Sequence, residues 1–93
     1  MRESEKRLEN ELRRAVKNTG GLCLKMGTSF LSGIPDRLCL FAGGRVCFVE
    51  VKTTGEKPKK IQLFFMRKLE KLGFDVRIID NTKALEELIN YYG

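Results

Sequence analysis

Histidine is absent from this sequence of 93 residues. That absence excludes Ser-His-Asp and Cys-His catalysis, imidazole acid–base chemistry and every metal site with a histidine ligand. No apolar run approaches the roughly 20 residues that a transmembrane helix needs, and the charged start, residues 1–14, lacks the apolar core of a signal peptide. The sequence therefore predicts a cytoplasmic protein without a membrane partner. Carboxylates and lysines remain as the obvious chemical groups.

Cysteine is scarce. Cys23, Cys39 and Cys47 are odd in number, lie among apolar residues and lack the paired short spacings of a zinc site. We therefore expect buried, reduced thiols. The sequence also lacks any Pro-, Ser- or Gln-rich stretch that would indicate a linker, so residues 1–93 are expected to form a single domain.

Basic residues exceed acidic ones. Eighteen Lys and Arg against twelve Asp and Glu leave a net charge of +6. This balance favours a polyanionic partner, such as nucleic acid or an anionic membrane surface. Charge alone does not identify the partner, because many small basic proteins bind neither.

Hydrophobic periodicity predicts the order of helices and strands. Helices are expected at 3–18, at 59–72 and from 82 onward, and strands at 22–26, 37–42, 45–52 and 74–79. A strand, helix and strand in succession normally form a right-handed crossover, so the last strand should run parallel to another strand of its sheet. The expected fold is α/β in the order αβββαβα, with a mixed central sheet flanked by helices.

The same patterns predict which side chains are buried. The strand at 45–52 is apolar on both faces, as expected at the centre of a sheet. Thr82 is expected to cap the last helix. The apolar stripes of the second and last helices are Ile61, Phe65, Leu69 and Leu72, and Leu85, Leu88, Ile89 and Tyr92. Phe64, Phe65 and Phe74 are expected in the core rather than stacked on bases.

Asp36, Glu50 and Lys52 are the candidates for chemistry. Cleaving a phosphodiester with water requires a nucleophile near neutral pH and countercharge for the transition state, and a bound divalent cation supplies both. Magnesium is commonly held by one or two carboxylates, so Asp36 and Glu50 suffice. Residues two apart on a strand point to one face, which places the Lys52 ammonium beside Glu50. A lone Glu-Val-Lys is usually a solvated strand edge, but this one ends an otherwise apolar run.

The hairpin register decides whether the two acids meet. A two-residue turn at Gly43-Gly44 would send Asp36 and Glu50 to opposite faces of the sheet. A three-residue loop, Ala42-Gly43-Gly44, closed by a left-handed glycine, places Asp36 opposite Glu50 instead. We predict this register or an equivalent bulge.

These residues resemble a known family. Pro35-Asp36 followed by Glu50-Val51-Lys52 resembles the PD-(D/E)xK pattern of the restriction-endonuclease-like nucleases. The likeness to the virus-type replication-repair nuclease (VRR-NUC) domain, in its stand-alone phage form, covers nearly the full chain. It includes Glu9, Gly20-Gly21, Lys25, Gly33-Ile34-Pro35-Asp36-Arg37, Phe48-Val49-Glu50-Val51-Lys52, Gln62 and Gly73. The layout is also similar to that of archaeal Holliday-junction resolvases.

The resemblance implies roles for the matching positions. It makes Asp36 and Glu50 metal ligands, the Val51 carbonyl a third ligand and Lys52 the catalytic lysine. Glu9 would be an outer-sphere acid and Gln62 would border the site. Glu9 shares a helical face with Leu12 and Val16, which suits that role, while Glu5 and Glu11 are its rivals.

Several basic and hydroxyl residues flank the candidate site. Lys57, Lys59 and Lys60 cluster around the loop after the Glu50 strand, where they could grip phosphates, although such a run is often only a solvated face. Lys25 is a further candidate for DNA contacts. The hydroxyl residues Thr28, Ser29 and Ser32, in the loop before Asp36, are candidates for contacts with the DNA backbone.

Three functions fit the sequence to different degrees. The acid–acid–lysine pattern and the basic charge favour a Mg²⁺- or Mn²⁺-dependent endonuclease, and the resemblance points to branched DNA such as Holliday junctions. A DNA-binding or assembly module on the same fold, without cleavage, is the alternative. The third function, a purely structural phage protein, does not explain why acids are placed in apolar, buried surroundings. A symmetric junction has two scissile strands, so a homodimer is expected.

Overall fold

The computed structural model describes residues 3–26 and 33–93. These residues form the expected succession αβββαβα. The elements are α1 (Glu3–Asn18), β1 (Leu22–Lys25), β2 (Arg37–Phe41), β3 (Arg45–Val51), α2 (Lys60–Lys71), β4 (Asp75–Ile79) and α3 (Thr82–Tyr92). The prediction of the element order is confirmed, with end points that differ by a residue at several positions.

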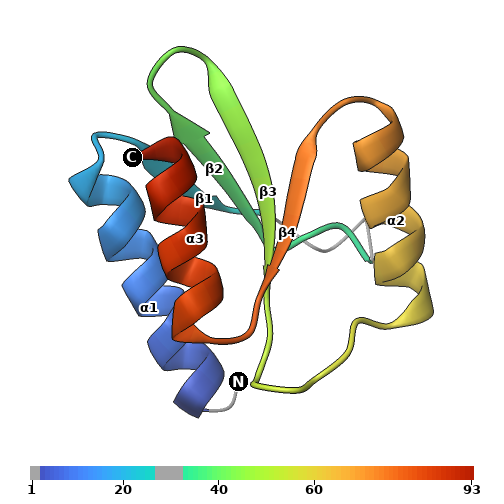
Figure 1. Cartoon of the computed structure of the whole chain (residues 1–93). Helices are drawn as coiled ribbons and strands as arrows, with labels where there is room; N and C mark the ends of the chain where they lie inside the picture. The colour runs from blue at the N-terminus through green and yellow to red at the C-terminus, as the bar shows by residue number, and fades with distance from the viewer. Residues whose placement is uncertain (1–2, 27–32) are drawn as a thin grey trace.

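The four strands lie in one mixed sheet in the order β1-β2-β3-β4. β1, β2 and β3 pair antiparallel, whereas β4 runs parallel to β3. The chain from β3 passes through α2 before it returns as β4, which confirms the predicted crossover (Figure 1). β3 lies between two neighbours, as its apolar sequence indicated.

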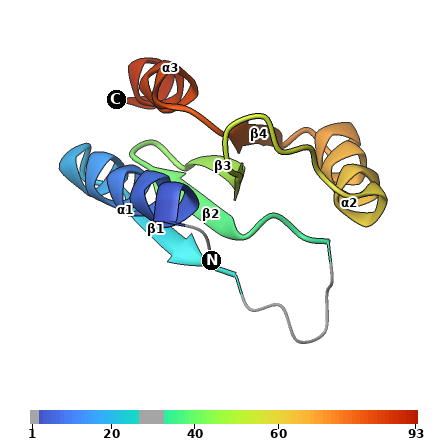
Figure 2. The same cartoon turned by 90° about the horizontal axis from the view of Figure 1, so that it is seen from below.

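The helices cover the two faces of the sheet unequally. α1 and α3 pack side by side on one face, and α2 lies on the other face beside β4 (Figure 2). The core lies under α1 and α3 and includes Leu12, Val16, Val49 and Leu88. Within the described ranges, no helix is long and apolar enough to span a bilayer.

α2 covers only part of the apolar stripe that its sequence indicated, since Phe65 and Leu69 are half-buried. Its buried residue is Met66, whereas Ile61 is exposed and Leu72 is 70% exposed. The placement of Phe64 and Phe74 in the core was also wrong, because both are exposed and Phe64 is 57% accessible. The reason is that α2 packs on one edge of the sheet only, so just a narrow strip of the helix is covered. Leu85, Leu88 and Tyr92 of α3 are buried as expected.

The cap of α3 corrects another prediction. Asn81, not Thr82, caps the helix, because the Asn81 side chain accepts a hydrogen bond from the Ala84 N–H at 2.8 Å. Thr82 is the first residue inside the helix. Both residue types favour this position, and periodicity alone does not separate neighbouring candidates.

The hairpin between β2 and β3 has the predicted register. Phe41 pairs with Arg45 and Arg37 pairs with Val49, so the loop contains three residues, 42–44. Gly43 and Gly44 have φ angles of 82° and 72°, the left-handed conformation that glycine adopts without steric penalty. This register brings the residue before β2, Asp36, next to the end of β3.

The three cysteines are free thiols, as expected. Cys39 and Cys47 are buried and Cys23 is half-buried, with 3.9 Å between the Cys23 and Cys39 sulfurs. All three lie on neighbouring strands at paired positions of the sheet.

Candidate active site

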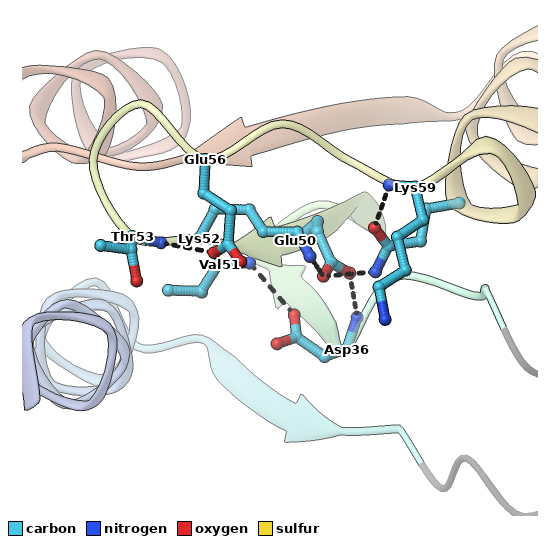
Figure 3. A network of polar contacts seen from close by, with 8 residues as sticks. Asp36, Glu50, Val51, Lys52, Thr53, Glu56 and Lys59 are labelled. Atoms are coloured by element: carbon cyan, nitrogen blue, oxygen red, sulfur yellow. Dashed lines mark hydrogen bonds and ion pairs between the residues drawn. The ribbon is translucent and has the colours of Figure 1, made fainter. Parts of the chain in front are cut away.

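Asp36 and Glu50 contact each other at the ends of β2 and β3. The Asp36 backbone N–H donates to Glu50 Oε1 at 3.2 Å, and the Val51 N–H donates to Asp36 Oδ1 at 3.2 Å. Figure 3 shows the two side chains meeting in one polar network. The predicted register therefore brings the two carboxylates to one place.

The segment before Asp36 is held firmly against α2. Gly33 has a φ angle of 94°, and a Cβ added there would lie 2.7 Å from Ile61 Cγ1 and 2.9 Å from the Ile61 carbonyl oxygen. Pro35 is fully buried. A glycine is required at this close approach, because any side chain would push the Asp36 segment away from α2.

Lys52 forms a buried ion pair with Glu50. Its Nζ lies 3.3 Å from Glu50 Oε2, and both side chains are almost completely covered. Buried charges are tolerated when they are paired, and removing one partner leaves the other uncompensated. The expected position of the lysine beside Glu50 is confirmed.

Gln62 connects the start of α2 to the carboxylates. Its Nε2 donates to Glu50 Oε2 at 3.0 Å, and its Oε1 accepts from the Lys59 N–H at 2.8 Å. Both oxygens of Glu50 therefore receive hydrogen bonds from this network. Gln62 borders the site, as the resemblance implied, and its contacts fix the orientation of Glu50.

The surroundings of Asp36 and Glu50 raise the pKa of both carboxyl groups. Burial, followed by the neighbouring negative charge of Glu50, raises the pKa of Asp36 to about 7, against the opposing effect of the hydrogen bond from the Val51 N–H. Burial also raises the pKa of Glu50, and the charge of Lys52 opposes that shift. A half-buried carboxyl group beside a buried one favours a nearby positive charge, because a cation offsets the cost of ionising both.

Their environment fits a divalent cation held by few protein ligands. In residues 3–26 and 33–93, no group of three or more His, Cys, Asp or Glu side chains is placed to hold a metal. Magnesium does not need such a group, since one or two carboxylates with waters and phosphate oxygens can complete its coordination. The like-charge repulsion between Asp36 and Glu50 is the observation that fits this cation. A role for the Val51 carbonyl stays a prediction.

Glu9 lies near this network but does not join it. It is buried on α1 and pairs with Arg37 of β2, and its Oε2 atom has no hydrogen-bond partner. Its charge contributes to the raised pKa of Asp36. The outer-sphere role of Glu9 stays a prediction. Of its rivals, Glu11 pairs with Arg7 at 3.9 Å, and the charge of Glu5 acts on Glu50.

Arg37 is the residue near the site whose part the sequence did not indicate. It is buried, and its side chain faces α1 rather than the carboxylates. The strand alternation contained the signal, because Arg37, Cys39 and Phe41 share one buried face of β2. An arginine at an inward position of a strand needs an acidic partner, and Glu9 supplies it.

The proposed DNA contacts are dispersed around the site. Lys57, Lys59 and Lys60 are exposed before and at the start of α2, and Lys25 is exposed at the end of β1. Lys59 lies next to the carboxylate network through its backbone (Figure 3). Ser32, Thr28 and Ser29 lie outside the described residues.

The mixed sheet, its helices and the order of elements define a restriction-endonuclease-like α/β fold. No family model matches the sequence. The structure is similar to a solved VRR_NUC domain, with a TM-score of 0.89 and 31% identity, over 97% of this chain and 98% of that one. The sequence is 36% identical over 74 residues to "Putative nuclease p44" of Acyrthosiphon pisum secondary endosymbiont phage 1, covering 80% of each chain. The chain belongs to the VRR-NUC family.

Proposed function

We propose that this protein is a Mg²⁺- or Mn²⁺-dependent endonuclease that hydrolyses DNA phosphodiester bonds. The observation that supports it best is the contact between Asp36 and Glu50 beside the buried Lys52. The name of the phage relative, a nuclease, points to the same chemistry. Two adjacent carboxylates with a lysine are the groups that metal-assisted phosphodiester hydrolysis requires.

Asp36 and Glu50, with the Val51 carbonyl, are the groups that would hold the metal. When bound, Mg²⁺ or Mn²⁺ supplies countercharge to the phosphate and lowers the pKa of a water molecule. The number of ions is left open by this proposal, since the same carboxylates serve one- and two-ion sites.

The side chains around the carboxylates have separate tasks. Lys52 is close enough to place its ammonium beside the reacting phosphate, where it offsets developing negative charge and orients the attacking water. Gln62 and the Asp36 N–H hold both oxygens of Glu50 in place. Because these positions are set before substrate arrives, little reorganisation is needed during the reaction.

We further propose that the substrate is DNA with branches, such as a Holliday junction. The net charge of +6 and the exposed lysines at 57, 59 and 60 support binding to a phosphate backbone. The choice of branched DNA rests on the resemblance to junction resolvases. Two active sites in a homodimer would suit the two scissile strands of a symmetric junction.

The experiment that tests catalysis uses labelled four-way junctions, flaps and linear duplexes with Mg²⁺. Wild-type protein is expected to cleave, and Asp36→Ala or a chelator should abolish cleavage. Glu86→Gln, which removes an exposed carboxylate on α3, is the matched control and should cleave normally. Cleavage that persists in Asp36→Ala would overturn the assignment of the site.

Two further measurements separate a nuclease from a binding module. Replacing Mg²⁺ by Ca²⁺ should preserve DNA binding and stop turnover, because Ca²⁺ tolerates irregular coordination that the reaction does not. Mg²⁺ should also raise the melting temperature of wild type more than that of Asp36→Asn. Binding without cleavage under every metal would support the non-catalytic module instead.

A further inference from the structure

A basic hollow lies between α1 and β1, away from the carboxylates. Its volume is about 650 Å³. The described residues around it include Asn10, Arg13, Arg14, Lys17, Gly21 and Cys23. Three of these are cations and none is an acid, so the hollow is a concentrated positive site.

The fold draws β1 close under the second half of α1. Gly21 connects the two elements, and a Cβ added there would lie 2.4 Å from the Leu40 carbonyl oxygen of β2. This tight approach requires glycine. The last turns of α1 therefore lie beside the start of β1, the edge strand against which α1 packs (Figure 1).

The three cations of the hollow lack an acidic partner among residues 3–26 and 33–93. In the described part of the chain, none of Arg13, Arg14 and Lys17 forms an ion pair, and all three are exposed. Arg13 donates to Asn10 Oδ1 at 3.5 Å, within its own helix. Arg13 and Lys17 stand four residues apart, a spacing at which like charges destabilise a helix. An anionic ligand would offset that repulsion.

Cys23 lines the hollow, close enough to Arg13 for the charge of that residue to act on the thiol. The pKa of Cys23 is lowered, first by its contact with the Cys39 thiol and then by the charges of Arg37 and Arg13. Such positive charge attracts anions. Guanidinium groups suit this task, since their planar donors match phosphate oxygens.

We propose that this hollow binds phosphates of the DNA backbone at a distance from the scissile bond, an inference that rests on the proposed nuclease function. Cys23 pairs with Cys39, which lies three residues along the strand from Asp36. At about 3.3 Å per residue, the separation along the strand is about 10 Å, or roughly three nucleotides of a duplex strand. The hollow therefore holds a DNA arm while the carboxylates act on another phosphate.

The test compares two charge-matched double variants of the full chain. Arg13→Ala/Lys17→Ala removes two cations from the hollow, and Lys6→Ala/Lys83→Ala removes two exposed cations elsewhere. Dissociation constants for a labelled four-way junction are measured in Ca²⁺ over a salt series. The hollow variant should bind about tenfold more weakly and lose roughly two units of salt slope, while the control variant stays near wild type.

One additional variant guards against a net-charge effect, and one measurement of stability guards against misfolding. Arg13→Lys/Lys17→Arg keeps both charges and should bind junctions within about twofold of wild type. Alanine at positions 13 and 17 should leave the melting temperature unchanged or higher, because it removes a repulsion from α1. Equal weakening of the hollow variant and the Lys6/Lys83 control, or no weakening of either, would overturn the proposal.

A third experiment distinguishes a hollow that binds DNA phosphates from one that binds free inorganic phosphate. Inorganic phosphate is titrated at constant ionic strength while the melting temperature is followed. Micromolar stabilisation of wild type that is lost in the hollow variant, with DNA affinity unaffected, would assign the hollow to a free anion and overturn the proposal. Weakened DNA binding without such stabilisation supports it.

Cleavage assays on the same proteins distinguish this inference from the proposed function. With Mg²⁺, the hollow variant should show a raised KM and an unchanged kcat, because a remote contact contributes equally to the ground and transition states. If wild type binds junctions through the hollow but never cuts them, the nuclease assignment fails and the hollow stands. If wild type cuts junctions and the hollow variant binds them as tightly as the control does, the proposal for the hollow fails and the nuclease assignment stands.

Discussion

Ionisation of Asp36 makes the stability of the metal-free protein depend on pH. Its pKa is raised to about 7, chiefly by burial and then by the charge of Glu50. In the unfolded chain the same carboxyl has a pKa near 4, so between about pH 4 and 7 the folded state holds a proton that the unfolded state has released. The raised pKa therefore adds to the free energy of unfolding. The addition is complete below about pH 4 and is lost as the pH rises through about 7.

The pH dependence provides a first prediction. Without metal, Asp36→Asn should be more stable than wild type at pH 8, by on the order of 1 to 3 kcal/mol, and nearly equal to it at pH 4. The asparagine keeps an oxygen for the Val51 N–H but removes the buried charge. Chemical denaturation with a chelator at both pH values measures the difference. Glu86→Gln is the control, and an Asp36→Asn protein that is less stable at pH 8 would contradict the prediction.

Gln62 is expected to act as a positioning residue. Its amide holds Glu50 Oε2 and the Lys59 N–H together, so Gln62→Ala frees the carboxylate to rotate. Loss of such an outer contact typically lowers activity or metal affinity by about 10- to 100-fold. We expect a lower kcat and a raised Mg²⁺ requirement with little change in junction affinity, measured by steady-state cleavage over a Mg²⁺ series.

Asn90→Ala removes an exposed amide from α3 and is the matched control for Gln62→Ala. It should leave the Mg²⁺ requirement unchanged. A normal kcat and Mg²⁺ dependence in Gln62→Ala would show that Glu50 keeps its orientation through Asp36 and Lys52 alone.

At the scale of elements, the close contact between Gly33 and Ile61 connects the segment before Asp36 to α2. A single methyl group added at Gly33 would disturb this contact. Gly33 and Gly44 both have positive φ angles, so alanine strains either position by about 1 to 2 kcal/mol. Only at Gly33 would the new Cβ collide with Ile61, whereas nothing lies within 4 Å at Gly44. Gly33→Ala should therefore lose more stability than Gly44→Ala and should also lose cleavage activity.

This pair of variants separates backbone strain from displacement of the site. Thermal unfolding and junction cleavage are measured for both. Gly44→Ala should remain active, because its strain is confined to the hairpin loop at the other end of β2 from Asp36. Equal activity in the two variants would mean that α2 and Asp36 are not coupled through Gly33.

At the scale of the whole molecule, the sheet face that α2 leaves open is a candidate dimer surface. Cys23 points toward α1, so Leu22 and Leu24 project from the opposite face of β1, and Leu24 is 42% exposed. The homodimer proposed for this protein would bury such apolar area. Leu24→Lys should shift the sedimentation of the protein from dimer to monomer.

Leu72→Lys is the control for the dimer, since Leu72 is exposed at the end of α2 and away from β1. It should leave the sedimentation unchanged. A wild-type protein that sediments as a monomer at micromolar concentration would contradict the dimer proposal, while cleavage of one strand at a time would remain compatible with the active site.

The order of helices and strands, the pairing of Asp36 with Glu50 and the position of Lys52 were predictable from the sequence. Strand periodicity depends only on neighbouring residues, and the register follows from the alternation of side chains and the loop length. The extent of burial along α2 was not predictable, because Ile61, Phe64 and Leu72 are apolar residues that the sheet does not reach. The cap at Asn81 was missed because two adjacent residues can serve.

The sequence by itself determined which chemical groups are available and which of them share a strand, because those properties are local. Only the tertiary structure decided the environment of each group. Burial and the closeness of Glu50 raise the pKa of Asp36, Arg37 pairs with Glu9, and the turn at Gly21 places the start of β1 beside three cations of α1. These effects depend on distances between segments remote in the chain, which no local pattern specifies.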